Sequence, residues 1–330
     1  MNSQIFRLGE LLTINETHEP DLYWALRGAG GGLFVIVTEL KLRLVRPPPL
    51  VRIFSSTWYT NATKPIIQRY QSLLFNDKTL NSNNNMFVAM QVKSAQVGIS
   101  IDHFGTDVSD FNKIISSLLD GLPTPNITNE RTQDWLSYVY ERSSAGGAEN
   151  NSSQLLLTNL TYPIYNFKAK HLYYNQPISD HSLDQLIDRL ALLKGRITTQ
   201  FNPWDGFSST IPVDQTAFPH RHFKFGIQFT VVWDEGQDEK QQLEWLNEVY
   251  LAIYNDSTKF SYINYIDREV PNWMDVYYHT HQQRLIQIQH IYDKDNRFYF
   301  EKTIESNGID QHLFLSCYLA SFTTFLSFIV

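Results

Sequence analysis

Apolar and polar residues alternate along much of the chain, in some stretches with the period of a strand and in others with the period of a helix. The strand pattern predicts strands at 50–59, 86–93, 97–104, near 196–201 and at 223–233. The helical pattern predicts helices at 64–75, 108–119, 182–193 and 239–254. Strands paired through tight connections, with helices returning across one face, indicate an α+β fold with an antiparallel sheet.

The region before residue 50 forms a separate group of predicted elements. Two strands are expected within residues 1–20, with a turn at Gly9 and Glu10 and the second strand at 11–14. Pro20 and Asp21 are typical of a helix start, so residues 22–27 should be a short helix. A β-branched and aromatic run then predicts a strand at 33–44. The prolines at 47–49 form a stiff linker that marks a domain boundary.

Three further stretches complete the expected organisation. Residues 121–165 are rich in Pro, Gly and Asn, which favours a surface loop or lid. Residues 282–292 have a helical pattern with Leu285, Ile288 and Tyr292 on one face, and the helix should end at the turn-forming residues 293–296. The apolar tail at 313–330 fits a marginal membrane helix, a lipid-anchor signal or sequence from a misread intron.

The glycine-rich stretch at 28–32 is the strongest local candidate for a ligand site. Four glycines interrupted only by Ala29 leave backbone N–H groups uncovered, which suits close approach to a phosphate or a flat ring. A dinucleotide fingerprint would need a third glycine where Leu33 stands, and a P-loop would need Gly-Lys-Ser/Thr. Neither motif is present, so an ordinary flexible connection is the alternative interpretation.

Four motifs in the same order resemble those of one enzyme family. They are DLYWALRGAGGGLFVIVTELKLRL at 21–44, VDQTAFPHRHFKFGIQFTVVW at 213–233, YINY at 262–265, and YYHTHQQRLIQIQHIYDKDNRFYF at 277–300. Together they resemble the FAD-linked oxidases of the vanillyl-alcohol oxidase type, in the berberine-bridge-enzyme-like and glucooligosaccharide-oxidase-like branch. The resemblance implies the C-terminal part of a PCMH-type FAD-binding domain together with a substrate domain built on an antiparallel sheet.

FAD is the cofactor implied by this resemblance. The positions that match flavin contacts in the family are Gly28, Gly30, Gly31, Gly32, Val37, Thr38, Tyr278 and His281. Two departures lie in the first motif, where Leu33 replaces the family's Asn and Val35 replaces its next Gly. Either change removes a feature that favours flavin binding.

The family's catalytic positions carry tyrosines and an amide here. Flavin oxidases need a base that takes a proton while hydride leaves carbon for the flavin. By resemblance Tyr265 is the base, with Tyr262 beside it, and Gln228 stands where the alkaloid branch has glutamate. Thr230 replaces the aspartate of the oligosaccharide oxidases and should face the same side of its strand as Gln228. The alternative for the two tyrosines is ordinary packing in a core.

Histidines offer two other hypotheses. His220 with Arg221 could form a general base with an arginine clamp, or a buried structural pair. His279 and His281 would share one face of a strand, which suggests a metal, but no third ligand is identifiable and no metal is expected.

The resemblance also predicts how the chain divides. Residues 1–46 correspond to a remnant of the FAD-binding domain, 47–275 to the substrate domain, 276–308 to a C-terminal module that packs on the FAD domain, and 309–330 to the apolar tail. The first matched motif lies late in the family's FAD domain, so the chain is expected to be a fragment, a truncated gene model or a degenerate paralogue.

Composition limits the possible partners. With 330 residues, 42% of them hydrophobic, the chain can fill two cores. A net charge of −7 argues against nucleic acid, and the lone Cys317 excludes internal disulfides and Cys-based metal sites. Several Asn-x-Ser/Thr sequons favour a secreted or cell-surface protein, although the N-terminus lacks the apolar segment of a signal peptide. They include those that begin at Asn15, Asn61, Asn126, Asn151, Asn159 and Asn255.

The expected function is therefore oxidation of a sugar or another alcohol, with oxygen as the final electron acceptor. One alternative is a non-catalytic remnant that binds carbohydrate or a partner protein. Another is an adhesive surface glycoprotein, and this one requires the apolar tail to attach the chain to a membrane.

Overall fold

A computed structural model of the chain describes residues 2–7, 10–59, 62–77, 80, 85–142, 166–192 and 196–304. The chain divides into two compact units, which are described separately. Unit 1 comprises the described residues of Met1–Val45, Ser208–Arg221 and Phe260–Val330, and unit 2 those of Arg46–Phe207 and His222–Lys259. Residues 208–221 and 260–275, grouped with the substrate domain in the sequence analysis, thus belong to unit 1. The expected apolar tail at 309–330 lies outside the described residues.

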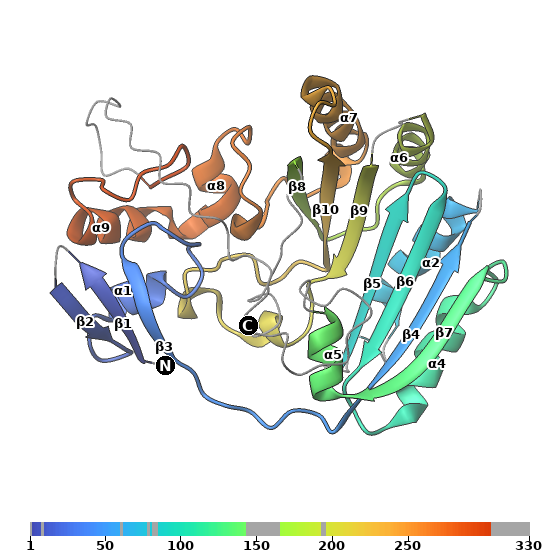
Figure 1. Cartoon of the computed structure of the whole chain (residues 1–330), viewed down its shortest axis with the longest axis horizontal. Helices are drawn as coiled ribbons and strands as arrows, with labels where there is room; N and C mark the ends of the chain where they lie inside the picture. The colour runs from blue at the N-terminus through green and yellow to red at the C-terminus, as the bar shows by residue number, and fades with distance from the viewer. Residues whose placement is uncertain are drawn as a thin grey trace. The chain divides into compact units, whose positions relative to one another are not determined.

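Unit 2 is built on one seven-stranded sheet, labelled in Figure 1, with the strand order β7-β4-β6-β5-β9-β10-β8. Every described pair of neighbouring strands is antiparallel. The strands are β4 (Leu50–Trp58), β5 (Met86–Lys93), β6 (Gln96–His103), β7 (Ile127–Asp134), β8 (Asn166–Tyr174), β9 (Arg196–Pro203) and β10 (Phe225–Trp233). The α+β class with an antiparallel sheet is therefore confirmed.

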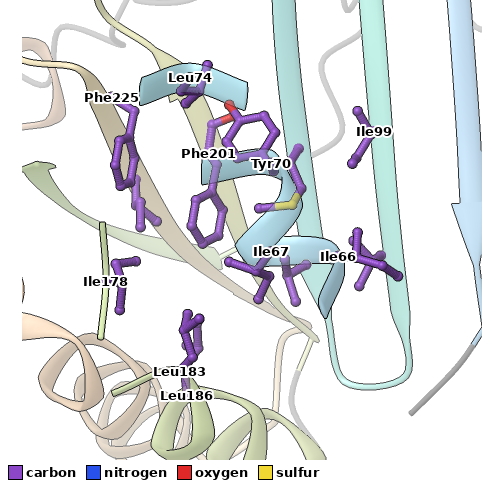
Figure 2. Packing of buried hydrophobic residues seen from close by; sticks show 14 of the residues in the cluster. Ile66, Ile67, Tyr70, Leu74, Ile99, Ile178, Leu183, Leu186, Phe201 and Phe225 are labelled. Atoms are coloured by element: carbon purple, nitrogen blue, oxygen red, sulfur yellow. The ribbon is translucent and has the colours of Figure 1, made fainter. Parts of the chain in front are cut away.

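Four helices of unit 2 pack their apolar sides against one face of this sheet: α2 (Thr63–Asn76), α4 (Val108–Leu119), α6 (Asp180–Leu192) and α7 (Glu239–Ala252). Figure 2 shows the centre of this core, where Tyr70 of α2 lies among aliphatic and aromatic side chains. The Tyr70 hydroxyl donates a hydrogen bond to the Val88 carbonyl over 2.9 Å, which satisfies its only donor inside the core.

Local chemistry explains where two of these helices begin. The Asp107 carboxylate accepts a hydrogen bond from the backbone N–H of Ser109 at the start of α4, and Asp238 accepts one from Gln241 at the start of α7. Side-chain caps of this kind satisfy N–H groups that have no partner in the first turn of a helix.

The helix α5 (Trp135–Arg142) packs on the opposite face of the sheet. Its Tyr138 clusters with Val51 and Ile53 of β4, whereas Phe54 and Trp58 of the same strand belong to the main core. Because side chains alternate between the two faces of a strand, the two clusters lie on opposite sides of β4.

The segment 121–165 was predicted as a loop, and this prediction is wrong for β7 and α5. Among the described strands β7 pairs with β4 alone, and its sequence ITNERTQD leaves most side chains exposed. An edge strand without a buried face carries no apolar alternation, so the sequence pattern did not reveal it. The strand β8 was also not anticipated. Residues 143–165 lie outside the described part of the chain.

Asp102 of β6 anchors α5 to the sheet. Its buried carboxylate lies 2.7 and 2.8 Å from Nη2 of Arg142 and accepts a hydrogen bond from the Tyr138 hydroxyl over 2.9 Å. Burial, followed by the charge of Asp102, raises the pKa of Tyr138 well above its usual range, so this phenol remains a donor.

Asp102→Asn should lower the free energy of unfolding by about 2 kcal/mol, because it weakens charge-assisted hydrogen bonds to a buried acceptor while Arg142 stays partly solvated. Urea denaturation measures the effect. The matched control is Asp120→Asn, since that carboxylate pairs with Arg69 but is 80% exposed, and should change stability by less than about 0.5 kcal/mol. Equal effects of the two substitutions would contradict the anchoring role.

Unit 1 contains a three-stranded antiparallel sheet of order β2-β1-β3 and three α-helices in its described part. The strands are β1 (Asn2–Arg7), β2 (Glu10–Ile14) and β3 (Ile36–Lys41), and the helices are α1 (Pro20–Ala25), α8 (Trp273–Tyr278) and α9 (Gln282–Tyr292). Short 3₁₀ turns labelled η2 (Val213–Gln215), η4 (Ile263–Tyr265) and η5 (His279–His281) connect them.

Several sequence predictions for unit 1 are confirmed. Helix α9 has the predicted bounds, and Leu285, Ile288 and Tyr292 are buried. The strand predicted at 33–44 is shorter, because Leu33 and Val35 leave the strand direction and are buried with the unit's core. In the described part of the chain, no helix is long and apolar enough to cross a membrane.

Candidate functional site

The glycine-rich loop of unit 1 follows directly from α1. Helix α1 carries Pro20 in its first turn and buries Leu22, Tyr23 and Trp24, so its end is held by the core. Gly28, Gly30 and Gly32 then adopt φ values of 137°, 89° and 72°, a region that favours glycine. The loop conformation therefore depends on glycine at these three positions.

The four glycines do not all serve the same purpose. A Cβ at Gly28 would lie 2.4 Å from the backbone nitrogen of Phe218, and one at Gly30 would lie 2.9 Å from Cγ1 of Ile263. Beside Gly31 and Gly32 nothing lies within 4 Å, and both residues are exposed. Gly28 and Gly30 thus allow close packing within the protein, while Gly31 and Gly32 present bare backbone to the surroundings.

Tyr278 supports this loop from within unit 1. Its side chain is fully buried, and its hydroxyl donates a hydrogen bond to the Ala29 carbonyl over 2.9 Å. Burial raises the pKa of Tyr278 well above its usual range, so the phenol remains a donor. Tyr278, expected from the family resemblance to contact flavin, contacts the backbone of the loop.

The predicted tyrosine pair lies next to the loop, with Tyr262 directly before η4 and Tyr265 at its end. The rings of Tyr262 and Tyr265 meet edge to face with centroids 5.4 Å apart, and Ile263 between them is the residue packed on Gly30. The Asn264 amide donates a hydrogen bond to the Tyr262 hydroxyl over 2.6 Å. Folding therefore brings the YINY motif and the glycine loop together, although more than 200 residues separate them in the sequence.

Burial is the main influence on the pKa of both phenols. It raises the pKa of Tyr262 and of Tyr265 above the usual value, and the neighbouring Tyr262 adds to the effect on Tyr265. Both phenols are consequently protonated at neutral pH. A base role for Tyr265 requires loss of this proton.

His281 is buried, and both of its ring nitrogens lie near protein oxygens. Nδ1 lies 3.2 Å from the Ala217 carbonyl and Nε2 lies 3.4 Å from Oδ1 of Asp214. The ring also meets Trp24 edge to face at 5.1 Å. His281, a predicted flavin contact, therefore packs between α1 and the 208–221 segment of unit 1.

The prediction that His279 and His281 lie on a strand is wrong. They begin and end η5, and His279 has a φ of 42°, which turns the chain between α8 and α9. Two histidines alone do not define a strand or helix periodicity, so their spacing could not identify the turn. Among the described residues no group of three or more His, Cys, Asp or Glu side chains could hold a metal ion.

His220 is a structural residue in this arrangement. It is 4% exposed, and its Nε2 lies 2.9 Å from the Val276 carbonyl, so it ties the 208–221 segment to α8. Burial lowers its pKa to about 4, which leaves the ring neutral at physiological pH. Of the two hypotheses for His220 and Arg221, the buried structural pair fits these contacts.

Acid should selectively weaken unit 1 through His220. The pKa of His220 is near 6.5 in the unfolded chain and about 4 in the folded chain. As the pH falls through this interval only the unfolded chain takes up the proton, so the free energy of unfolding decreases. The expected loss is about 3 kcal/mol. Urea unfolding of wild type and His220→Gln, measured at pH 7.5 and pH 4, should show their stability difference shrinking by about this amount. A constant difference would contradict the buried neutral ring.

Val37 and Thr38, the remaining predicted flavin contacts, lie on β3 with exposed side chains. The strand pairs with β1 on one side, and its register shifts near these residues. They lie in unit 1, like the loop and the tyrosine pair.

Gln228 lies in unit 2, on the sheet face opposite the main core. It is directly across from Gln200 of β9 and from His171 of β8, and Gln200 is across from Gln91 of β5. Residues directly opposite each other share a face, so four polar side chains form one row across four strands. We call Gln91, Gln200, Gln228 and His171 the amide row. The Gln91 amide donates to Gln200 over 3.3 Å.

The amide row was not anticipated beyond Gln228. Gln91 and Gln200 are half-buried, as is Thr230, which shares the face of Gln228 as predicted. Only strand alternation could have suggested the outward direction of Gln91 and Gln200, and the strand order that aligns them is not visible in the sequence.

Comparison with known proteins agrees with this geometry. Residues 261–305, which contain η4, α8 and α9, match the family model described as "Berberine and berberine like". A curated relative, the monolignol oxidoreductase AtBBE-like 13 of Arabidopsis thaliana, is 27% identical over 309 residues, covering 86% of this chain and 56% of the relative. The chain is thus similar to berberine-bridge-like oxidoreductases.

Other proteins extend the match to most of the described elements. The uncharacterized FAD-linked oxidoreductase YgaK of Bacillus subtilis is 25% identical over 301 residues, with 89% of this chain and 61% of YgaK covered. The structure of BBE-like 1 from Physcomitrella patens superposes on 93% of this chain and 65% of its own with a TM-score of 0.82, at 23% sequence identity. The chain thus spans between half and two thirds of the length of these relatives, and FAD is the cofactor that the relationship implies.

The residues of unit 1 fit such a cofactor. Gly31 and Gly32 leave open space where any other residue would place a side chain, and the loop is held rigidly by Tyr278, Phe218 and Ile263. Exposed backbone N–H groups on a rigid loop suit the carbonyl and nitrogen acceptors of a flavin ring.

Proposed function

We propose that this berberine-bridge-like chain forms part of an FAD-dependent oxidase that converts a hydroxyl group of a sugar or another alcohol into a carbonyl. The observation that carries the proposal is the packing of the tyrosine turn η4 on the glycine loop, with Ile263 against Gly30. This contact puts a candidate base and a candidate flavin loop in the same unit.

Each residue has a stated role in this proposal. Gly30, Gly31 and Gly32 hold the flavin through their backbone, and Tyr278 and His281 support the surrounding scaffold. When bound, FAD accepts the hydride from the substrate carbon and passes the two electrons to oxygen, which gives hydrogen peroxide. Tyr265 takes the hydroxyl proton, so the carbon–oxygen double bond forms as hydride leaves, and Tyr262 orients Tyr265 through their ring contact.

The substrate class is supported by the amide row of unit 2. Amide side chains both donate and accept hydrogen bonds, as do sugar hydroxyls, so a row of them suits a polyhydroxylated substrate better than an apolar one. The named relative AtBBE-like 13 acts on monolignols, which also carry an alcohol group. In this proposal unit 2 is the substrate domain, and Gln228 belongs to its amide row.

Entry into the secretory route is a further part of the proposal. Of the sequon asparagines in the described residues, Asn126 and Asn255 are exposed. Expression in a eukaryotic host followed by glycosidase treatment should reduce the apparent mass of the protein. An unchanged mass would contradict this part.

The decisive test is a visible absorption spectrum of the purified chain with and without added FAD. We expect a flavin band at roughly 450 nm that survives gel filtration. We also expect the protein to release peroxide with sugars or other alcohols. A colourless protein that FAD cannot reconstitute would overturn the oxidase proposal for this chain.

A further inference from the structure

Arg221 of unit 1 carries a buried charge that has no acidic partner among the described residues. The side chain is 1% exposed. Its Nη1 donates to the Ser208 carbonyl over 3.3 Å and its Nη2 donates to the Thr216 hydroxyl, while Nε is buried without a hydrogen-bond partner in the described chain. Every acceptor that it contacts is neutral.

Arg27 lies close by and is half-buried. Its Nη2 donates to the Gln215 carbonyl over 3.1 Å, and its guanidinium lies 4.1 Å from the centre of the Tyr23 ring. Within the described residues neither Arg27 nor Arg221 forms an ion pair. Burial lowers the pKa of Arg221, and the positive charge of Arg27 lowers it further, which indicates two like charges near each other.

Two neighbouring guanidinium groups without a counter-charge lower the stability of the folded protein. A buried charge is retained in proteins when it is paired, and neutral hydrogen bonds compensate only part of its lost hydration. The ring of Phe218, 5.3 Å from the Arg221 guanidinium, adds an attraction that is small beside this cost. Asp214, the carboxylate nearest to Arg221 in sequence, lies against His281.

The arginine pair adjoins the glycine loop. Arg27 directly precedes Gly28, and Phe218 contacts Arg221 with its ring and Gly28 with its backbone. Within the described chain the N–H groups of Gly30, Gly31 and Gly32 take part in no hydrogen bond. Positive side chains and open N–H groups therefore occur at one loop.

We propose that the half-buried Arg27 and the exposed backbone of Gly31 and Gly32 bind a phosphoryl oxyanion, and that the buried charge of Arg221 strengthens this binding from behind Arg27. The planar fork of a guanidinium matches two oxygens of such a group, and consecutive backbone N–H groups form a concave anion site. Two positive charges match a phosphoryl dianion better than a singly charged carboxylate. The site does not depend on the oxidation chemistry proposed above.

Titration calorimetry of the full chain with inorganic phosphate and pyrophosphate, without flavin, tests the proposal. Saturable binding is expected in wild type. Arg27→Gln should raise Kd at least about tenfold, the effect of losing one charge-assisted contact. Arg221→Gln should also raise Kd, because it removes the second positive charge. Arg221→Lys keeps that charge, so its Kd should lie between those of wild type and Arg221→Gln.

Arg284→Gln is the matched control. This arginine also belongs to unit 1 and lies over an aromatic ring, but it is paired with Asp21 at 2.6 Å. Its Kd should equal that of wild type. Arg27 is only half-buried, so Arg27→Gln keeps the test valid if Arg221→Gln does not fold. An absence of binding, or an equal Kd in Arg27→Gln, Arg284→Gln and wild type, overturns the proposal.

Competition identifies the source of the phosphoryl group. If FMN displaces phosphate and riboflavin does not, the site takes the phosphate of a flavin nucleotide. If neither displaces it, the site takes a free phosphate. Because the titration needs no flavin, a failure here leaves the oxidase proposal intact, and a colourless protein leaves this site intact.

Discussion

Gly28→Ala is expected to lower the stability of unit 1 by roughly 2–5 kcal/mol. The new Cβ would lie 2.4 Å from the Phe218 nitrogen and 2.6 Å from the Phe218 Cβ, so backbone would have to move. The φ of 137° adds strain that only glycine avoids. Left-handed backbone costs about 1–2 kcal/mol for other residues, and overpacking about 1–3 kcal/mol. Chemical denaturation of the whole chain measures the loss.

The control is Gly31→Ala, in the same loop. Nothing lies within 4 Å of the added methyl group, and the residue is exposed, so stability should change by less than about 1 kcal/mol. Gly30→Ala should fall between the two, because its Cβ would meet only the Ile263 side chain at 2.9 Å. Equal losses at positions 28 and 31 would show that packing on Phe218 does not determine the loop.

Tyr265→Phe is expected to slow substrate oxidation in the FAD-loaded chain by about 10²–10⁴-fold, the usual contribution of a positioned base. The phenylalanine keeps the ring contact with Tyr262 and removes only the proton acceptor. Anaerobic stopped-flow measurement of flavin reduction isolates this step. Tyr262→Phe should have a smaller effect, since the Tyr262 hydroxyl already accepts a hydrogen bond from Asn264.

The same step should depend on pH. Burial raises the pKa of Tyr265 above its usual value near 10, so only a small fraction of the phenol is ionised at neutral pH. Flavin reduction in wild type should therefore rise about tenfold per pH unit below this pKa. The dependence should disappear in Tyr265→Phe. A flat profile in wild type would assign the base role to another group.

The sequence predicted elements best where they bury one face. Strand β10 was predicted from its alternation, and Ile227, Phe229 and Val231 are all fully buried. Helix α9 was predicted to the residue for the same reason. The edge strand β7 and helix α5 were missed because they bury few side chains, so no periodic signal marks them.

Within the candidate site, motifs identified residues but not all of their contacts. Tyr278 and His281 were predicted to contact a flavin, whereas in the fold their polar atoms meet protein oxygens. The amide row became visible only with the strand order, because register depends on pairing between distant strands. Local residue patterns carry no information about such pairing.

By itself the sequence determined the α+β class, most of the helices and strands, the glycine loop and the family of FAD-linked oxidoreductases that it resembles. These depend on local periodicity and on residue order. Only the tertiary structure decided that Gly28 and Gly30 are packed against Phe218 and Ile263, and that the Arg221 charge is buried among neutral groups. The glycine contacts join segments about 200 residues apart, and the burial of Arg221 depends on how the chain folds around it, so both are properties of the folded chain alone.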